Sequence, residues 1–186
     1  MDLLDALGAA TEEFGKRLAL VHADMWTSAT PCPEWDVSYL AAHVIGGNRF
    51  AIEVLAGLSA ADAIEQVMST PQLGDDAMGA WRSTSQAQIA AFQLPDVLTE
   101  HIDHPLGEIT GYQFLEFRVY DITLHAWDLA RSIGADEELD SRLVDAVIGI
   151  VEHGPPGMGF GVKALTLAML DASPQVRLLD LCGRHS

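Results

Sequence analysis

The chain has 186 residues, and its 27 acidic residues against 10 lysines and arginines give a formal net charge of −17 at pH 7. Such a charge repels phosphate backbones and anionic lipid, so binding to nucleic acid or to a membrane surface is disfavoured. Hydrophobic residues make up 49% of the chain and charged residues 20%, which is enough apolar material for one folded domain.

The cysteine content and the N-terminal sequence favour an intracellular location. Cys32 and Cys182 are too few for a disulfide framework, and acidic residues stand near the N-terminus where a secretory signal carries positive charge. No apolar run approaches the roughly 20 residues that span a bilayer. We therefore expect a cytoplasmic protein with reduced thiols, either a monomer or a homodimer, since no heptad pattern specifies an interface.

Apolar residues recur at helical spacing along most of the chain, and this pattern predicts an all-α fold. A short closing helix should begin after Ser173, and the longer helices are expected over residues 3–22, 36–57, 75–92, 111–133 and 138–152. Residues 94–110 contain two prolines and are expected to form a long loop over the bundle.

The C-terminal part of the chain changes character after residue 158. The apolar run 159–170 is compatible with an extended segment or a buried helix, and we favour the extended segment. The expected organisation is a helical bundle in residues 1–158 with a C-terminal extension, residues 159–186, packed on it.

One narrow polar line follows the otherwise apolar helix expected over residues 111–133. It consists of Arg118, Asp121, His125 and Asp128. Residues four apart lie one turn, about 5 Å, along the same helix face, so Asp121 and His125 can bind a single ion or proton. The alternative is a line that faces solvent, with exposed ion pairs between neighbouring side chains.

The helix expected over residues 36–57 supplies a third candidate ligand. His43 lies at the edge of its apolar face, so the imidazole should be buried, and Gly47 one turn further should leave space beside the ring. A core histidine with a satisfied hydrogen bond is the alternative. Together with Asp121 and His125, His43 would complete a set of two imidazoles and one carboxylate that leaves positions open for water or substrate, as catalytic metal sites do.

Three strings carry a resemblance to a known family: TPCPEWDVSYLAAHVIGGN at residues 30–48, DITLHAWDLA at residues 121–130 and DASPQVRLLDLCGR at residues 171–184. The first two resemble the signature segments of the mycothiol-dependent maleylpyruvate isomerase N-terminal family, within the DinB-like superfamily. The third resembles the ending of a shorter-chain branch. The resemblance implies a DinB-like four-helix bundle with an additional helix and a short C-terminal extension.

The same resemblance implies a divalent metal, with zinc favoured over nickel or iron, bound by His43, Asp121 and His125. The isomerase of that family has a glutamate at the position of Asp121 and a larger C-terminal domain. The resemblance also implies mycothiol as a thiol cofactor and a small electrophile as its partner.

The predicted function is that of a metal-dependent isomerase or S-transferase. A divalent cation favours the thiolate form of a bound thiol and so creates a nucleophile at neutral pH. Asn48 or Arg118 would orient the cofactor or substrate. The alternative is a non-catalytic bundle that binds a metal or a small ligand, because a fold does not assign a reaction.

Other candidate residues are expected to be structural. Cys32 lies between prolines before a helix start, where a helix dipole favours a thiolate, but a buried structural cysteine is the favoured interpretation. His101 and His104 have a spacing compatible with metal binding, yet they are expected to be solvated loop residues that could line a pocket mouth. Trp35 is expected to be a core residue or the wall of a cleft.

Overall fold

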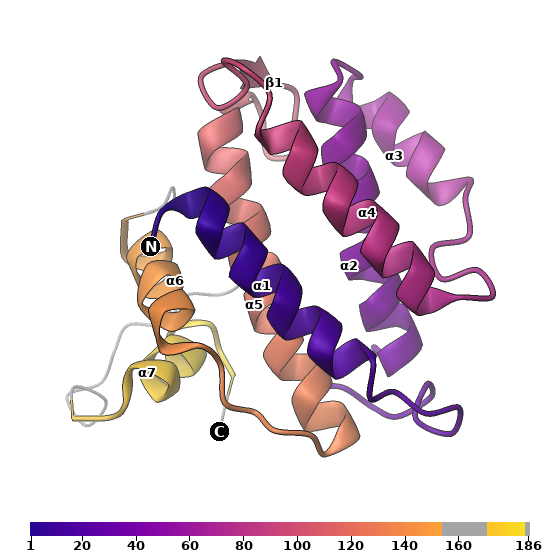
Figure 1. The fold of residues 1–186 in the computed structure, drawn as a ribbon, viewed down its shortest axis with the longest axis vertical. Helices are drawn as coiled ribbons and strands as arrows, with labels where there is room; N and C mark the ends of the chain where they lie inside the picture. The colour runs from indigo at the N-terminus through magenta and orange to yellow at the C-terminus, as the bar shows by residue number, and fades with distance from the viewer. Residues whose placement is uncertain (154–170, 185–186) are drawn as a thin grey trace.

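The computed structural model describes residues 1–153 and 171–184, and these form a mainly helical molecule (Figure 1). The helices are α1 Leu3–Leu18, α2 Val37–Leu55, α3 Ala60–Met68, α4 Ala77–Phe92, α5 Gly111–Ile133, α6 Ser141–His153 and α7 Pro174–Leu181. The predicted all-α fold is confirmed.

Four of the helices form the bundle. α1 packs against α4 and α5, and α2 also packs against α4 and α5, so these four helices close a ring around the core. α6 packs on α1 and α5, and α7 packs on α6. Figure 1 shows α6 and α7 at one side of the bundle and α3 at the other.

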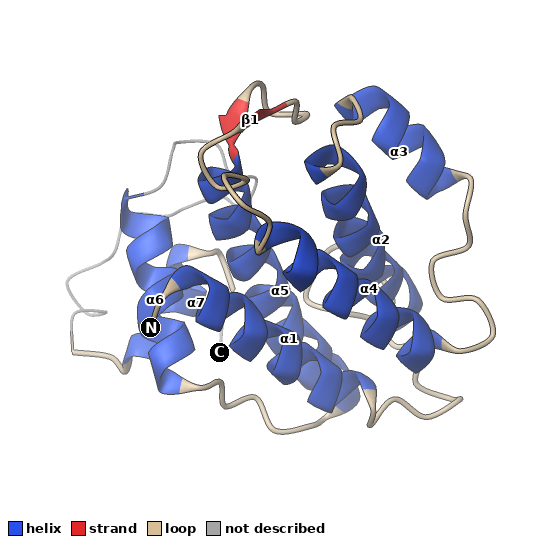
Figure 2. Cartoon of the chain, turned by 45° about the horizontal axis from the view of Figure 1, so that its top comes forward, coloured by secondary structure: helices blue, strands red, loops and turns tan. Residues whose placement is uncertain are grey.

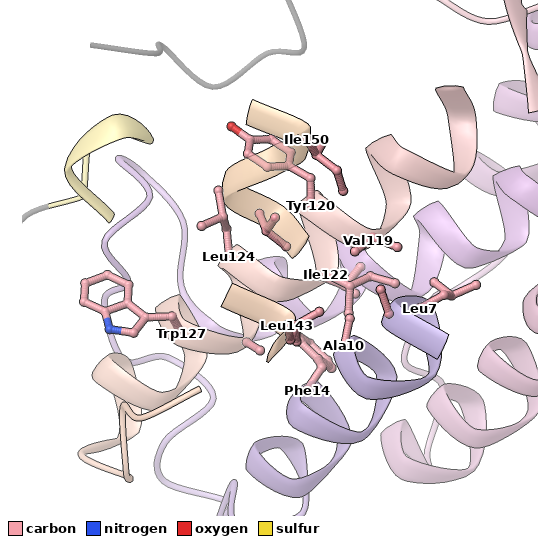
Figure 3. Close-up of a cluster of buried hydrophobic side chains, with 14 of the residues drawn as sticks. Leu7, Ala10, Phe14, Val119, Tyr120, Ile122, Leu124, Trp127, Leu143 and Ile150 are labelled. Atoms are coloured by element: carbon pink, nitrogen blue, oxygen red, sulfur yellow. The ribbon is translucent and has the colours of Figure 1, made fainter. Parts of the chain in front are cut away.

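The core between α1, α5 and α6 consists of buried apolar side chains, most of them large (Figure 3). The residues labelled there are Leu7, Ala10, Phe14, Val119, Tyr120, Ile122, Leu124, Trp127, Leu143 and Ile150. Burial of one large apolar side chain stabilises the fold by about 1.5–3 kcal/mol relative to its exposure. This core fixes α5 in the centre of the molecule.

Capping residues set the helix ends. Asp36 accepts a hydrogen bond from a first-turn backbone N–H of α2, and Ser173 does the same at the start of α7. Thr110 opens α5 with a capping box, and Gly134 ends it in the left-handed conformation, with φ of 67°. The first helix stops at Leu18 rather than at residue 22.

Two segments differ from the sequence-based expectation. The nine-residue helix α3, capped by Ser59, was not predicted. Within the expected loop 94–110, strands β1 (His101–Ile102) and β2 (Ile109–Thr110) pair antiparallel. Figure 2 shows this hairpin beside the start of α5. Strands of two residues are too short to show the alternation that marks a strand.

The boundary of the C-terminal extension stays a prediction. The run 159–170, for which an extended segment was favoured, lies outside the described residues, whereas α7 and the residues up to Arg184 are described. Across the two described ranges, none of the helices has both the length and the apolar character that crossing a bilayer requires.

Candidate metal centre

The three residues predicted as metal ligands converge between α2 and α5. His43 Nε2 lies 3.4 Å from Asp121 Oδ1, and His125 Nε2 lies 3.3 Å from the same oxygen. Their three donor atoms all lie within 4.8 Å of one another. Donors that stand about 2.0–2.1 Å from a tetrahedral zinc ion are about 3.3–3.4 Å apart. The donor set and its spacing therefore fit a divalent cation.

Burial of the polar line on α5 decides between its two interpretations. The side chains of Arg118, Asp121, His125 and Asp128 are each at most 3% exposed. The alternative in which this line faces solvent is therefore wrong. Buried charges need partners, and here each one contacts a group of opposite charge.

His43 is more open than predicted. Its side chain is 39% exposed, although Nε2 is turned towards Asp121. Trp35 packs against the imidazole with ring centroids 4.8 Å apart, and its ring also lies 5.6 Å from that of His125. The prediction of a buried imidazole was wrong because the edge of the apolar face of α2 borders a pocket rather than the core.

The space predicted beside Gly47 is filled by the guanidinium of Arg118, which a Cβ at this position would strike. Arg118 donates from Nη1 to Asp121 Oδ2 at 2.7 Å. It also donates from Nε to Gln88 Oε1 at 2.8 Å and from Nη2 to Asn48 Oδ1 at 2.9 Å. Arg118 thus engages one carboxylate oxygen of Asp121, while the other oxygen faces the two histidines.

Asn48 supports Arg118 from within the core. Its side chain is fully buried, and Nδ2 donates to Thr84 Oγ1 at 3.2 Å and to Ser85 Oγ at 3.4 Å. In the sequence, polar residues such as Thr84 and Ser85 interrupt the apolar face of α4. In the structure, these two side chains accept the hydrogen bonds from Asn48. Asn48 is not part of the pocket wall, whereas Arg118 is.

A second buried carboxylate holds the other ring nitrogen of His125. Asp128 Oδ2 lies 3.0 Å from His125 Nδ1. Arg184 donates from Nη2 to Asp128 Oδ2 at 2.7 Å and from Nε to Oδ1 at 3.2 Å. Metal-binding histidines commonly donate their second ring nitrogen to a carboxylate, which fixes the tautomer. Arg184 is not among the residues predicted from the sequence, because no local pattern links it to a residue 56 positions away.

In this cluster, burial and the neighbouring charges shift the pKa values of Asp121 and His125 in opposite directions. Burial raises the pKa of Asp121, but the imidazoles of His43 and His125 hold it well below its ordinary value. Burial lowers the pKa of His125, but the Asp121 and Asp128 carboxylates raise it well above the usual value. A proton on His125 and a divalent cation are therefore alternatives at this point, since a metal ligand must be deprotonated.

Cys32 lies against the same cluster. It is half-buried, whereas the sequence-based expectation was a buried cysteine. Its Sγ is 3.4 Å from Asp128 Oδ2 and 3.9 Å from His125 Nδ1. Cys32, His125 and Asp128 form a second group with metal-ligand spacing. The two groups share His125, and they approach it through different ring nitrogens.

A pocket of about 530 Å³ opens beside two of the three donor residues, His43 and Asp121, and its size suits a small-molecule ligand. His43, Asp121 and Arg118 form part of its wall. His104 also lines it, in agreement with the expectation of a pocket mouth. His101, by contrast, is exposed and pairs with Glu108 at 3.2 Å.

His104 is buried rather than solvated. Its ring centroid lies 5.3–5.8 Å from those of Phe50, Phe114 and Phe117. The backbone N–H of Leu106 donates to its Nδ1 at 3.2 Å. Burial, followed by the charge of Arg118, lowers its pKa, which favours the neutral imidazole.

Residues 7–130 match the family model described as the mycothiol maleylpyruvate isomerase N-terminal domain. This range covers well over half of the 186 residues. The chain belongs to this family. The matched range includes His43, Asp121 and His125 together with Asp128, while Arg184 lies beyond it.

The chain is also similar to individual proteins of known sequence or structure. The uncharacterized proteins MT0763 and Rv0738 of Mycobacterium tuberculosis (strains CDC 1551 / Oshkosh and ATCC 25618 / H37Rv) are each 35% identical over 143 residues, 77% of this chain and 74% of theirs. Crystal structures of the mycothiol-dependent maleylpyruvate isomerase and of a histidine-to-alanine mutant align with TM-scores of 0.60 and 0.62. They are 16% identical and cover 81% of this chain and 70% of theirs, a likeness that shows the helical DinB-like fold.

Proposed function

We propose that this protein is a metal-dependent enzyme in which a divalent cation activates a low-molecular-weight thiol against a small electrophile. The observation that carries the proposal is the convergence of His43, Asp121 and His125 beside a pocket. Two imidazoles and one carboxylate suit zinc, which we favour, and also nickel and iron. The family supports mycothiol as the thiol, and an isomerase or S-transferase as the class of enzyme.

A divalent cation would supply a thiolate at neutral pH by lowering the pKa of a coordinated thiol. The chain's own residues would orient the donors. Asp128 accepts the Nδ1 proton of His125, which leaves Nε2 directed at the point where the donors meet. Arg118 occupies Oδ2 of Asp121, so that Oδ1 remains for the cation.

Arg118 and Asn48 keep roles in this proposal that differ from each other. Arg118 forms part of the pocket wall and would orient a bound substrate through the Asp121 carboxylate that it positions, because its Nε and Nη2 already donate to Gln88 and Asn48. Asn48 would act through Arg118, because it contacts the guanidinium at 2.9 Å and is fully buried.

Non-catalytic binding of a metal or small ligand is the second candidate function. The observation that favours it is the pairing of charges around the donors. Asp121 is paired with Arg118 at 2.7 Å, and Asp128 is paired with Arg184 at 2.7 Å. A network paired in this way can also serve a purely structural purpose.

A thiol-transfer assay separates the two candidates. The zinc-loaded protein would be incubated with mycothiol and a panel of small electrophiles, including maleylpyruvate, and loss of thiol or isomerisation would be followed. We expect saturable turnover that is abolished in His43→Ala and retained in His101→Ala, a matched change at an exposed histidine outside the cluster. Stoichiometric metal without turnover of any pair would favour the binding function.

A further inference from the structure

The pocket beside the candidate metal ligands has two ends, and both are set by α2 and α5. At one end, His43 Nε2 on α2 lies 3.4 Å from Asp121 Oδ1 on α5. On α2, Phe50 follows His43 by seven residues. On α5, Phe114 precedes Asp121 by the same number, and its ring centroid is 5.9 Å from that of Phe50. Seven residues span about 10 Å, or two turns, along a helix axis. All four residues line the pocket, which therefore extends over this length.

His104 lies at the end of the pocket that is remote from the metal ligands. It belongs to the segment that joins β1 to β2, in the hairpin beside the start of α5 (Figure 2). Its ring centroid is 5.8 Å from that of Phe50 and 5.3 Å from that of Phe114. We propose that His104 donates a hydrogen bond from Nε2 to an oxygen of the electrophilic substrate at this end. That the ligand is the substrate rests on the proposed function, whereas the presence of the donor does not.

The hydrogen bonding of the His104 ring leaves Nε2 as the donor. The backbone N–H of Leu106 donates to Nδ1 at 3.2 Å, so Nδ1 carries no proton and the neutral ring has its proton on Nε2. Burial and the charge of Arg118 lower the pKa of His104, which keeps the ring neutral. Within residues 1–153 and 171–184, Nε2 has no hydrogen-bond partner and is not closed off from solvent. A ligand in the pocket can therefore accept from it.

The other polar side chains of the wall, apart from the metal ligands, do not compete for this oxygen. The amide of Gln72 is held by Arg49 and by two backbone carbonyl groups. The three nitrogens of the Arg118 guanidinium each donate to a protein acceptor. Tyr39 lies one turn before His43, at the opposite end of the pocket. The imidazole at the remote end is the donor that remains free in the described part of the wall.

The charges of the wall admit an anionic oxygen as well as a neutral one. Asp121 is paired with Arg118 at 2.7 Å, so these two charges balance. The divalent cation of the proposed function would add two positive charges at the metal ligands, of which a bound thiolate balances one. The wall then has a net positive charge, so a carboxylate oxygen or a carbonyl oxygen can accept from Nε2 of His104.

The length of the pocket indicates a substrate with two functional groups. Its electrophilic carbon must reach the thiol beside the metal ligands, and its acceptor oxygen must reach His104 at the other end. Phe117, which lies between Phe114 and Asp121 on α5, also lines the pocket, and its apolar ring suits a carbon chain. The inferred class is a small electrophile with a carbonyl or carboxylate group several bonds from the reacting carbon.

Two unreactive probes test the donor without turnover. Glutarate has a carboxylate at each end of a short carbon chain, and pentanoate has a methyl group in place of one of them. The zinc-loaded protein and its variants would be titrated calorimetrically with both. We expect His104→Phe to weaken glutarate binding about tenfold or more and to change pentanoate binding by less than about twofold, because only glutarate has a second carboxylate for Nε2. His104→Gln keeps an amide donor and should retain most of the glutarate affinity.

The variants are chosen so that the fold is retained. The phenylalanine of His104→Phe would join the rings of Phe50, Phe114 and Phe117, and the residue that loses its acceptor, Leu106, is exposed to water. His101→Phe, at an exposed histidine of the same hairpin, should leave both affinities unchanged.

Nuclear magnetic resonance gives a second readout of the contact. In wild-type protein with isotopically labelled histidine, glutarate should shift the Nε2–H resonance of His104. An unshifted resonance, equal glutarate affinities in the wild type and His104→Phe, or no binding of glutarate would overturn the proposal.

The outcomes separate this inference from the proposed function. Without a bound cation, the single carboxylate of pentanoate would itself go to His104, and His104→Phe would weaken both probes. That result would remove the proposed function and leave the donor assigned. Thiol transfer together with a glutarate affinity that His104→Phe does not change would remove the inference and leave the proposed function intact.

Discussion

Arg184 donates two hydrogen bonds to the buried carboxylate of Asp128: Nη2 lies 2.7 Å from Oδ2 and Nε lies 3.2 Å from Oδ1. Asp128 in turn contacts Nδ1 of His125 at 3.0 Å. A residue of the C-terminal segment therefore positions a candidate ligand on α5 through a single carboxylate. Such supporting groups tune the affinity of a metal site although they never touch the metal.

Replacement of this arginine tests the positioning role. Arg184→Gln should raise the dissociation constant for zinc by about tenfold, because Asp128 loses the partner that fixes it against His125. The constant can be measured by competition with a chromogenic chelator. Arg177→Gln is the matched control, since Arg177 lies on α7 and its Nη2 contacts Glu152 at 3.6 Å, outside the cluster. Equal zinc affinities in the two variants would contradict the role assigned to Arg184.

Gly47 and Gly46 provide a matched pair on α2. A Cβ at Gly47 would strike the guanidinium of Arg118, whereas one at Gly46 would meet its nearest side-chain atoms at 3.5 Å, an ordinary contact. Gly47→Ala should therefore lower the free energy of unfolding by about 1–3 kcal/mol, because Arg118 must move away from Asp121.

The matched substitution at Gly46 is not expected to lower the free energy of unfolding. Gly46→Ala should leave the free energy of unfolding unchanged or raise it by up to about 1 kcal/mol, since alanine is the better helix former. Urea unfolding of both variants measures the difference. A Gly47→Ala protein as stable as Gly46→Ala would show that Arg118 is not needed where the structure places it.

His104 makes stability depend on pH. Burial and the charge of Arg118 lower its pKa in the folded state, so the unfolded chain binds the proton more readily. The contribution of His104 to stability should therefore fall as the pH drops below the ordinary value of about 6.5, and stay constant above it. His104→Gln should remove this part of the slope in urea unfolding between pH 7.5 and 5.5. His101→Gln, at an exposed side chain, should keep it; a slope unchanged by both substitutions would refute the assignment.

The sequence predicted the helices and the three converging residues because their signals are local or shared with a family. Asp36 and Ser173 cap helices within a few residues of the chain, and Asp121 and His125 lie one turn apart on α5. The helix α3 was missed, because it has nine residues and buries only Ala60 and Ala63. So short an apolar face gives little periodicity.

What the sequence did not reveal depends on contacts between distant segments. Arg118 pairs with Gln88, 30 residues away, and Arg184 with Asp128, 56 residues away. The burial of His43 was overestimated for a related reason. Periodicity places a side chain on a helix face, but whether that face meets the core or a pocket depends on helices elsewhere in the chain.

The metal content of the purified protein tests the central claim most directly. Elemental analysis by mass spectrometry would be performed on the wild-type protein and on His43→Ala, Asp121→Asn and His125→Ala, with His101→Ala as control. The account predicts near-stoichiometric divalent metal in the wild type and the control, and its loss in the three ligand variants. Wild-type protein that is folded but takes up no divalent metal, even when zinc, nickel and iron are supplied, would contradict it.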